Sequence, residues 1–177
     1  MSVPGRNLDG MTGHTLFDTA IGECGLAWGP RGITAVRLPG PMRFQPAPAE
    51  PPPAVRAAIT RVQALLSGVK DDLADIELDP TGVPEFNLRV YAVTRAIPPG
   101  EVLTYGTVAQ RIGAPGSAQA VGRALGRNPY PIIVPCHRVM GADGRMVGFS
   151  APGGTTTKLR MLAIEGAADP NGQEALF

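Results

Sequence analysis

Two reactive side chains stand next to each other in the second half of the chain, the thiol of Cys136 and the imidazole of His137. A cysteine attacks carbon far better as a thiolate, and a neighbouring base or cation is how a protein lowers the pKa of a thiol. Adjacency alone is weak evidence, because a buried structural cysteine beside a surface histidine has the same pattern. Pro135 and Arg138 flank the pair and complete a tetrad. Cys136 and His137 are therefore a candidate nucleophile and base, and the surrounding residues determine whether that interpretation holds.

The elements before the tetrad must position it. Residues 132–134 form a short β-branched run, which predicts a buried strand of minimal length. Pro135 has no N–H to donate, so it ends that strand and fixes the backbone before Cys136. Farther upstream, residues 86–96 predict a helix, which Ile97-Pro98-Pro99-Gly100 closes.

Two further short helices are expected between that helix and the tetrad. Thr104 can cap one that runs to residue 112, and Ser117 can cap another that runs to about residue 126. The turn at Gly113-Ala114-Pro115-Gly116 makes the pair a candidate helix-turn-helix, a pattern that plain αα-hairpins share.

The second of these helices has an unusual composition. One face carries small residues, which allow another backbone to approach closely, and the neighbouring edge carries polar and basic residues, which can hold phosphates. Tight packing against another helix would select the same small face. The small face is Ala118, Gly122 and Gly126, and the edge is Gln119, Arg123 and Arg127.

The first half of the chain predicts a small α/β unit. Residues 14–38 have the pattern of short strands, with a turn at Gly29-Pro30-Arg31-Gly32. Seven of the fifteen residues from 39 to 53 are proline, which predicts an extended loop.

A helix and a further strand complete that unit. Apolar residues at helical spacing over 55–66 mark one face of the helix, which Gly68 ends, and residues 75–79 are a candidate strand. We therefore expect an α/β domain over residues 1–80 and a mainly helical domain over residues 81–177.

Composition excludes several classes of protein. No apolar run approaches the ~18 residues that span a bilayer, and the N-terminus lacks a secretory signal pattern, so a cytoplasmic protein without a membrane partner is expected. In a reducing compartment Cys24 and Cys136 are expected to be free thiols. Structural zinc needs four dedicated ligands, and two of the four available Cys and His residues belong to the tetrad, so no metal site is expected.

The charge is unevenly distributed along the chain. Residues 1–85 carry seven Lys and Arg against ten Asp and Glu, whereas residues 86–177 carry nine against five. A polyanionic partner is therefore expected to meet the C-terminal half.

Taken together, the motifs resemble those of the O6-alkylguanine-DNA alkyltransferases, the single-turnover DNA-repair methyltransferases. The resemblance covers about residues 82–166, and residues 1–80 match only weakly. Pro-Cys-His-Arg-Val is a specific signature, and five further matches in the same order make chance a poor explanation. In chain order the matches are Pro99-Gly100-Glu101-Val102-Leu103-Thr104-Tyr105-Gly106, Ala120-Val121-Gly122, Asn128-Pro129, Pro135-Cys136-His137-Arg138-Val139, Gly148-Phe149-Ser150 and Leu162-Ala163-Ile164-Glu165-Gly166.

This resemblance implies a fold and an activity. The N-terminal α/β domain would contain a small RNase H-like antiparallel sheet with helices, and the C-terminal domain would carry a winged-helix-like helix-turn-helix. The activity would be irreversible, stoichiometric transfer of the alkyl group from O6-alkylguanine in DNA to Cys136, after nucleotide flipping. Whether O4-alkylthymine is also a substrate stays open. No cofactor is implied, because the alkyl group remains on the cysteine as a thioether. The partner would be double-stranded DNA, bound by a monomer through the minor groove.

The resemblance also implies roles in catalysis. Cys136 would attack the alkyl carbon in line, and His137 would relay its proton through a water to Glu165, whose carboxylate orients that relay. Asn128 would lie beside the sulfur and stabilise the turn that holds it. Tyr105 would donate its hydroxyl to the departing guanine, on which negative charge develops.

Two further sets of residues follow from the resemblance. Small side chains suit a helix in the narrow minor groove, and the DNA-binding set is Ser117, Ala118, Gln119, Ala120, Gly122, Arg123 and Arg127. The implied substrate pocket is Leu125, Val139, Val147, Gly148, Phe149, Ser150 and Lys158. Arg138 is expected to make structural hydrogen bonds.

Two positions depart from the pattern of the family. Gln119 stands where an Arg usually fills the space left by the flipped base, and Phe149 stands where Tyr is common. A non-enzymatic lesion-binding relative is the nearest alternative, although such proteins lack the reactive cysteine that Cys136 supplies. A Cys-His hydrolase is a second alternative, but it would need an oxyanion hole that no motif here indicates.

Overall fold

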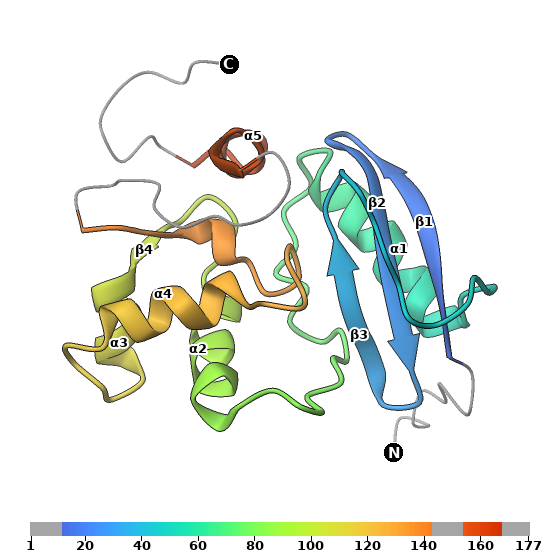
Figure 1. The fold of residues 1–177 in the computed structure, drawn as a ribbon. Helices are drawn as coiled ribbons and strands as arrows, with labels where there is room; N and C mark the ends of the chain where they lie inside the picture. The colour runs from blue at the N-terminus through green and yellow to red at the C-terminus, as the bar shows by residue number, and fades with distance from the viewer. Residues whose placement is uncertain (1–11, 143–153, 168–177) are drawn as a thin grey trace, which may run out of the picture.

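The computed structural model describes residues 12–142 and 154–167. Figure 1 shows two parts side by side, a three-stranded antiparallel sheet backed by one helix and a group of helices that includes α2, α3 and α4. The result is an α/β fold with a small antiparallel sheet plus helices, as predicted at that level.

The sheet is a simple meander. Its strands are β1 (Gly13–Thr19), β2 (Gly22–Gly29) and β3 (Gly32–Arg37), paired antiparallel in the order β1-β2-β3. The predicted turn between β2 and β3 is confirmed. Gly32 is required there because its φ is +134° and a Cβ atom would lie 2.7 Å from the carbonyl oxygen of Glu77.

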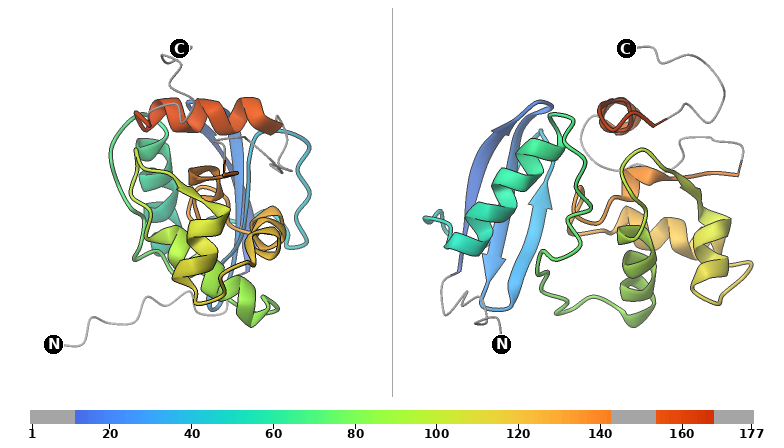
Figure 2. Two further views of the ribbon diagram at one scale, coloured as in Figure 1. Left: turned by 90° about the vertical axis from the view of Figure 1, so that its left-hand side faces the viewer. Right: turned by 180° about the vertical axis from the view of Figure 1, so that it is seen from behind.

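Helix α1 (Pro53–Leu65) covers the back of the sheet, as the rear view in Figure 2 shows. Its buried residues recur at helical spacing and pack into the same core as the buried strand residues. Gly68, at φ +101°, ends the last turn, where its N–H donates to the carbonyl of Leu65 at 3.0 Å. The buried face of α1 is Val55, Ala58, Ile59, Val62 and Leu65.

The strand predicted over residues 75–79 is wrong. This segment makes only an isolated parallel bridge to β3, in which the Ile33 N–H donates to Glu77 at 3.0 Å and the Asp79 N–H donates to Ile33 at 2.8 Å. Pro80 follows directly and offers no N–H, so the ladder cannot continue.

The three predicted helices of the second half are confirmed within a residue or two, as α2 (Glu85–Arg95), α3 (Tyr105–Arg111) and α4 (Ala118–Gly126). Thr104 caps α3 as expected, accepting from the N–H of Thr107 at 3.1 Å. Ser117 is the N-cap residue of α4, but its side chain makes no capping hydrogen bond. Its ψ of 26° is outside the extended region that aims a capping hydroxyl at the free N–H groups.

The strand predicted over residues 132–134 is also wrong, although all three residues are buried. They form turns, and Ile132 has a φ of 76°, which is rare for a β-branched residue. After this loop come a short 3-10 helix (Cys136–Arg138) and β5 (Val139–Met140), which pairs in parallel with β4 (Leu103–Thr104).

The two parts of the molecule share one buried cluster of apolar residues. The Val36 N–H of β3 donates to the carbonyl of Pro129 at 2.8 Å, and Tyr130 donates its hydroxyl to the carbonyl of Asp79. Helix α5 (Gly154–Ile164) lies across one end of the molecule, where Arg160 donates to Ala20 in the β1–β2 turn (Figures 1 and 2). Within residues 12–142 and 154–167, no helix is long and apolar enough to cross a membrane.

Candidate active site

Cys136 is held at the end of a tight turn. Pro135 has φ −79° and ψ 67°, and the Cys136 N–H donates to the carbonyl of Val134 at 2.7 Å, which is the geometry of an inverse γ-turn. The Arg138 N–H then donates to Pro135 at 2.9 Å and begins the 3-10 helix. Cys136 is only 9% exposed, so little of the residue is accessible to a reacting molecule.

Asn128 ties this turn to helix α4. Its side-chain amide donates to the carbonyl of Val134 at 2.8 Å, and its carbonyl oxygen accepts from the N–H of Tyr130 at 2.9 Å. Since Asn128 lies only two residues beyond the end of α4, these bonds fix the turn that carries Cys136 relative to that helix.

Three charged or titratable side chains form a buried cluster behind the thiol. His137 Nε2 lies 2.8 Å from Glu165 Oε1, while Arg138 donates from Nε to Oε2 at 2.9 Å and from Nη2 to Oε1 at 2.7 Å. The His137–Glu165 contact is direct, so the expected water between these two residues is wrong. Arg138 makes the structural hydrogen bonds that were expected, including one from Nη1 to the carbonyl of Ile97 at 2.7 Å.

Burial and charge set the protonation of this cluster. Burial raises the pKa of Glu165, but the hydrogen bonds from His137 and Arg138 outweigh it and hold that pKa at about 2. Burial lowers the pKa of His137, against the opposing effect of Glu165. The histidine is therefore neutral at pH 7. An ionised carboxylate only accepts, so Nε2 carries the proton and Nδ1 keeps its lone pair.

The thiol of Cys136 needs a base. Burial raises its pKa, and the hydrogen bond from Asn128 and the charge of Lys158 only partly oppose that rise. Within the described residues His137 Nδ1 is buried and has no hydrogen-bond partner. It is thus a neutral acceptor on the residue next to the thiol.

Tyr105 and Lys158 complete the surroundings of the thiol. Tyr105 begins α3 and faces α4, where a Cβ atom on Gly122 would lie 4.0 Å from the ring. Burial, and then the nearby Cys136, raise the pKa of the Tyr105 phenol, so it stays a proton donor at neutral pH. Lys158 of α5 donates from Nζ to the carbonyl of Val139 at 2.7 Å.

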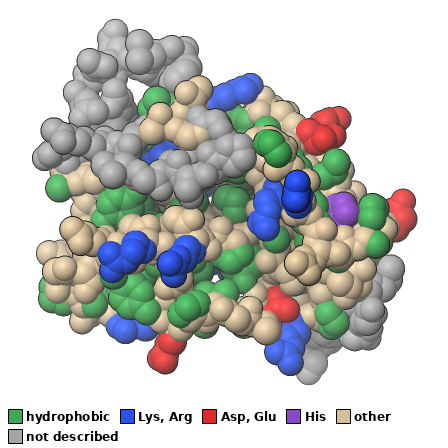
Figure 3. Space-filling model, in the orientation of Figure 1, with side chains coloured by type: hydrophobic (Ala, Val, Ile, Leu, Met, Phe, Trp, Pro, Cys, Tyr) green, Lys and Arg blue, Asp and Glu red, His purple; other side chains and the backbone are tan. Residues whose placement is uncertain are grey.

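The other predicted site residues fall into three groups. Leu125 and Val139 are buried in the apolar core that also contains Cys136. Val147, Gly148, Phe149 and Ser150 lie outside the described residues. On α4 the side chains of Gln119, Arg123 and Arg127 are exposed, whereas Ala118, Ala120 and Gly122 are half-buried. Figure 3 shows basic side chains on the surface over α4.

Two supporting groups were missed by the sequence analysis. Tyr91 donates its hydroxyl to the carbonyl of Ala124 at 2.6 Å and so ties α2 to α4. Its place on the buried stripe of α2 could have identified it as a core residue. The carbonyl of Ile97 holds Arg138, and no sequence signal marks a backbone acceptor. In the described part of the chain, His, Cys, Asp and Glu side chains form no group of three that could hold a metal.

Comparison with known proteins identifies the family. Residues 85–167 match the family model of the 6-O-methylguanine DNA methyltransferase DNA-binding domain. A methylated-DNA–protein-cysteine methyltransferase of Methanothermobacter thermautotrophicus is 36% identical over 155 residues, which cover 88% of this chain and 83% of that protein. This chain belongs to that family.

Solved structures of the methyltransferase family extend the match to the fold. The O6-methylguanine methyltransferase of Mycobacterium tuberculosis is 37% identical, with a TM-score of 0.76 over 88% of this chain and 93% of that chain. The same bacterium's protein in complex with DNA is 34% identical, with a TM-score of 0.72 over 91% and 99% of the two chains. The family predicted from the Pro-Cys-His-Arg-Val signature is thus confirmed.

Proposed function

We propose that this protein repairs DNA by moving the alkyl group of O6-alkylguanine irreversibly onto Cys136, once per molecule. The observation that carries the proposal is the joint geometry of the thiol and the buried cluster. Cys136 projects from a fixed turn, and the adjacent His137 has one ring nitrogen held by Glu165 and the other free to accept a proton. Family membership supports the same activity.

The reaction is a displacement at the alkyl carbon. His137 Nδ1 takes the thiol proton, directly or through a water, as the sulfur attacks. The C–S bond forms while the C–O bond breaks, and its electron pair passes to the guanine. Tyr105 donates its phenolic proton to the departing base, and the proton held by His137 restores the phenol. The net products are an S-alkylcysteine and unmodified guanine, so no cofactor takes part.

Arg138 and Glu165 position His137, the residue that receives the thiol proton. Two hydrogen bonds from Arg138 keep the Glu165 carboxylate ionised and fixed in orientation. The carboxylate then holds the Nε2–H tautomer of His137 and stabilises the imidazolium that forms during attack. Asn128 holds the Cys136 turn, and Lys158 holds the chain just after it at Val139.

The target base must leave the helical stack before the buried thiol can reach it. We assign contact with the minor groove to α4, because its half-buried Ala and Gly residues let the helix approach closely, and flipping then delivers the nucleotide to Cys136. We also propose that the protein acts as a monomer in the cytoplasm. Residues 1–80 would form an RNase H-like domain, and residues 81–177 would form a winged-helix-like alkyltransferase domain.

Intact-mass measurement tests the proposal. After incubation with a duplex that contains O6-methylguanine, the wild-type protein should gain the mass of one methyl group, and Cys136→Ala should gain none. Peptide mapping should place the methyl on Cys136 and not on Cys24, which is fully buried in the sheet. A protein that binds the lesion without any gain in mass would instead be a lesion-binding relative, the alternative that Gln119 keeps open.

A further inference from the structure

A second group of basic side chains lies on the face of the molecule that carries α4, and it belongs to the sheet. The Arg37 guanidinium carbon lies 5.8 Å from the centre of the Phe44 ring, and the His14 ring stacks on the same phenylalanine with its centre 4.6 Å away. Arg43 precedes Phe44 and is exposed. We call His14, Arg37, Arg43 and Phe44 the Phe44 platform.

The platform is anchored on the sheet. Phe44 packs on β2 at Gly25, where a Cβ atom would lie 2.6 Å from the ring. His14 Nδ1 lies 2.7 Å from the carbonyl of Pro46, which ties the loop to β1. The two arginines therefore extend from a fixed surface, and less side-chain and loop entropy is lost when they bind a ligand.

The Phe44 platform and α4 lie on the same face of the molecule, and a backbone hydrogen bond connects the segments next to them. Val36, which precedes Arg37, donates its N–H to the carbonyl of Pro129 at 2.8 Å, two residues beyond Arg127. In Figure 1 both α4 and the outer face of the sheet point toward the viewer, whereas α1 and α2 are in front in the rear view of Figure 2. Figure 3 shows a histidine side chain with basic side chains beside it on the same face as the basic side chains over α4.

The arginines on this face lack acidic partners. Within the described residues Arg37, Arg43, Arg123 and Arg127 form no ion pair, and Arg37 donates only to the carbonyl of its neighbour Val36. By contrast, Arg61 on α1 binds two aspartates. Uncompensated guanidinium groups on a fixed base are suited to the phosphates of a nucleic-acid backbone.

We propose that Arg37 and Arg43 bind phosphates on the arm of the duplex that extends beyond α4, so that the sheet forms part of the DNA interface. The inference rests on the proposed function in one respect, that α4 is the helix that contacts the lesion site. The first half of the chain is acidic as a whole, but these two cations lie on the face that α4 occupies.

The salt dependence of DNA binding tests the platform directly. We would compare the wild-type protein, the double variant Arg37→Gln/Arg43→Gln and the charge-matched control Arg56→Gln/Lys70→Gln. Arg56 lies on α1, on the opposite side of the sheet, and exposed Lys70 lies in the segment after that helix. Affinity for an unmodified duplex is measured by fluorescence anisotropy between about 50 and 200 mM salt.

Loss of both phosphate contacts should reduce the magnitude of the slope of log affinity against log salt by about 0.9 per contact, or roughly 1.8 for the pair. Affinity near 0.1 M salt should fall roughly tenfold or more in the double variant, and the control should behave as wild type. Trimming the duplex on the arm that covers the platform should abolish the difference. A double variant with the slope and affinity of the control would overturn the proposal.

A second measurement separates this inference from the proposed activity. The rate of repair on a duplex is divided by the rate with free O6-benzylguanine, which has no phosphates, so that any general loss of active protein cancels. The ratio should fall in the double variant only. Normal alkyl transfer with an unchanged ratio would refute the platform and leave the activity standing. Salt-dependent DNA binding that needs the platform, without any alkyl transfer, would refute the activity alone.

Discussion

Cys136 and His137 rest as a neutral thiol and a neutral imidazole, and not as the thiolate–imidazolium pair of many reactive cysteines. Burial raises the pKa of the thiol and lowers the pKa of the imidazole, so the ground state is a neutral thiol beside a neutral base. A free thiolate would react with many electrophiles, whereas this arrangement forms one only when the proton can move to His137. The shared carboxylate of Glu165 makes that transfer favourable.

Glu165→Gln should slow the reaction with free O6-benzylguanine roughly tenfold to a hundredfold, part of the 10²–10⁴ that a general base contributes. An amide cannot neutralise Arg138 and the forming imidazolium together. Because Glu165 raises the pKa of His137, the acidic limb of the pH–rate profile should move to lower pH in the variant. Stopped-flow rates across pH measure this, with exposed Glu101→Gln as the control. An unchanged rate would mean that Glu165 is only structural.

His137 should also make the stability of the protein depend on pH. Its pKa in the folded state lies below the ordinary value of 6.5, so below pH 6.5 the unfolded chain binds a proton there that the folded chain does not. The free energy of unfolding should therefore decrease as the pH falls from 7 through this range. Urea titrations at several pH values should show a flatter profile for His137→Gln than for the wild-type protein. Equal slopes in the two proteins would contradict the buried neutral histidine.

At the level of single elements, helix α4 connects the surface that we propose contacts DNA to the nucleophile. Its inner side is fixed by buried Val121 and Leu125, and its last turn leads through Asn128 into the turn that holds Cys136. Its outer side presents exposed Gln119 at the second position of the helix. Any side chain inserted into the DNA stack from this position is thus connected to the thiol by a short, hydrogen-bonded path.

Gln119→Arg should raise the repair rate on duplex DNA more than on single strands. Flipping a nucleotide leaves an unstacked partner base at a cost of a few kcal/mol, and Arg offers stacking area and charge where Gln offers hydrogen bonding alone. The free base needs no flipping, so its rate should change little. The measurement is the second-order rate constant of the wild-type protein and the variant on the duplex, the single strand and the free base. Equal effects on all three would show that residue 119 acts on the pocket and not on base extrusion.

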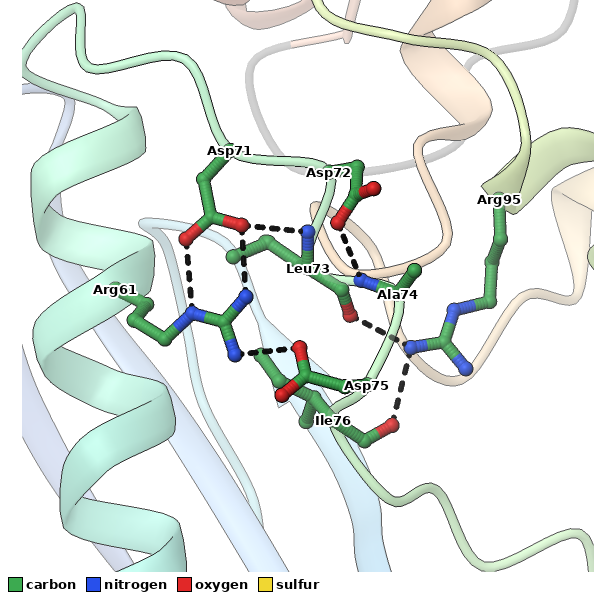
Figure 4. Close-up of polar contacts among 8 residues, drawn as sticks. All are labelled: Arg61, Asp71, Asp72, Leu73, Ala74, Asp75, Ile76 and Arg95. Carbon is green, nitrogen blue, oxygen red and sulfur yellow. Dashed lines mark hydrogen bonds and ion pairs between the residues drawn. The ribbon is translucent and has the colours of Figure 1, made fainter.

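At the scale of the whole molecule, the segment between α1 and α2 links the two parts through opposed arginines (Figure 4). Arg61 of α1 binds Asp71 through two hydrogen bonds of 2.8 and 2.7 Å and Asp75 through one of 2.7 Å. From the other side, Arg95 of α2 donates to the carbonyls of Leu73 and Ile76 at 2.8 and 3.0 Å. Arg95 lies two residues before Ile97, whose carbonyl holds Arg138.

Arg95→Met should destabilise the protein by about 1–3 kcal/mol, because two carbonyls in a partly buried segment lose their donor. The expected result in urea titration is a lower midpoint with an unchanged slope. Arg56→Met, which removes an exposed arginine from α1, should stay close to wild type. If Arg95→Met and Arg56→Met had the same free energy of unfolding, the hydrogen bonds from Arg95 to Leu73 and Ile76 would contribute nothing to the stability of the folded state.

Local sequence determined the helices and the identity of the reactive pair. Helical periodicity, the Thr104 cap and glycine stops depend on neighbours within a few positions, and α1 to α4 accordingly lie where they were expected. The Pro-Cys-His-Arg-Val signature places nucleophile and base in adjacent positions. Glu165 was reached only through the resemblance, because nothing local to it marks a partner for His137.

The contacts between distant segments depend on the tertiary fold. Residues 132–134 have the composition of a strand, yet they turn because Asn128 takes up the Val134 carbonyl and flanking prolines supply no donors for a ladder. The sharing of one carboxylate by His137 and Arg138 depends in the same way on packing between parts far apart in the chain, as does the hydrogen bond from Val36 to Pro129. Such contacts produce no periodic pattern in the sequence, because each depends on residues that are close in the fold and not on residues that are adjacent in the chain.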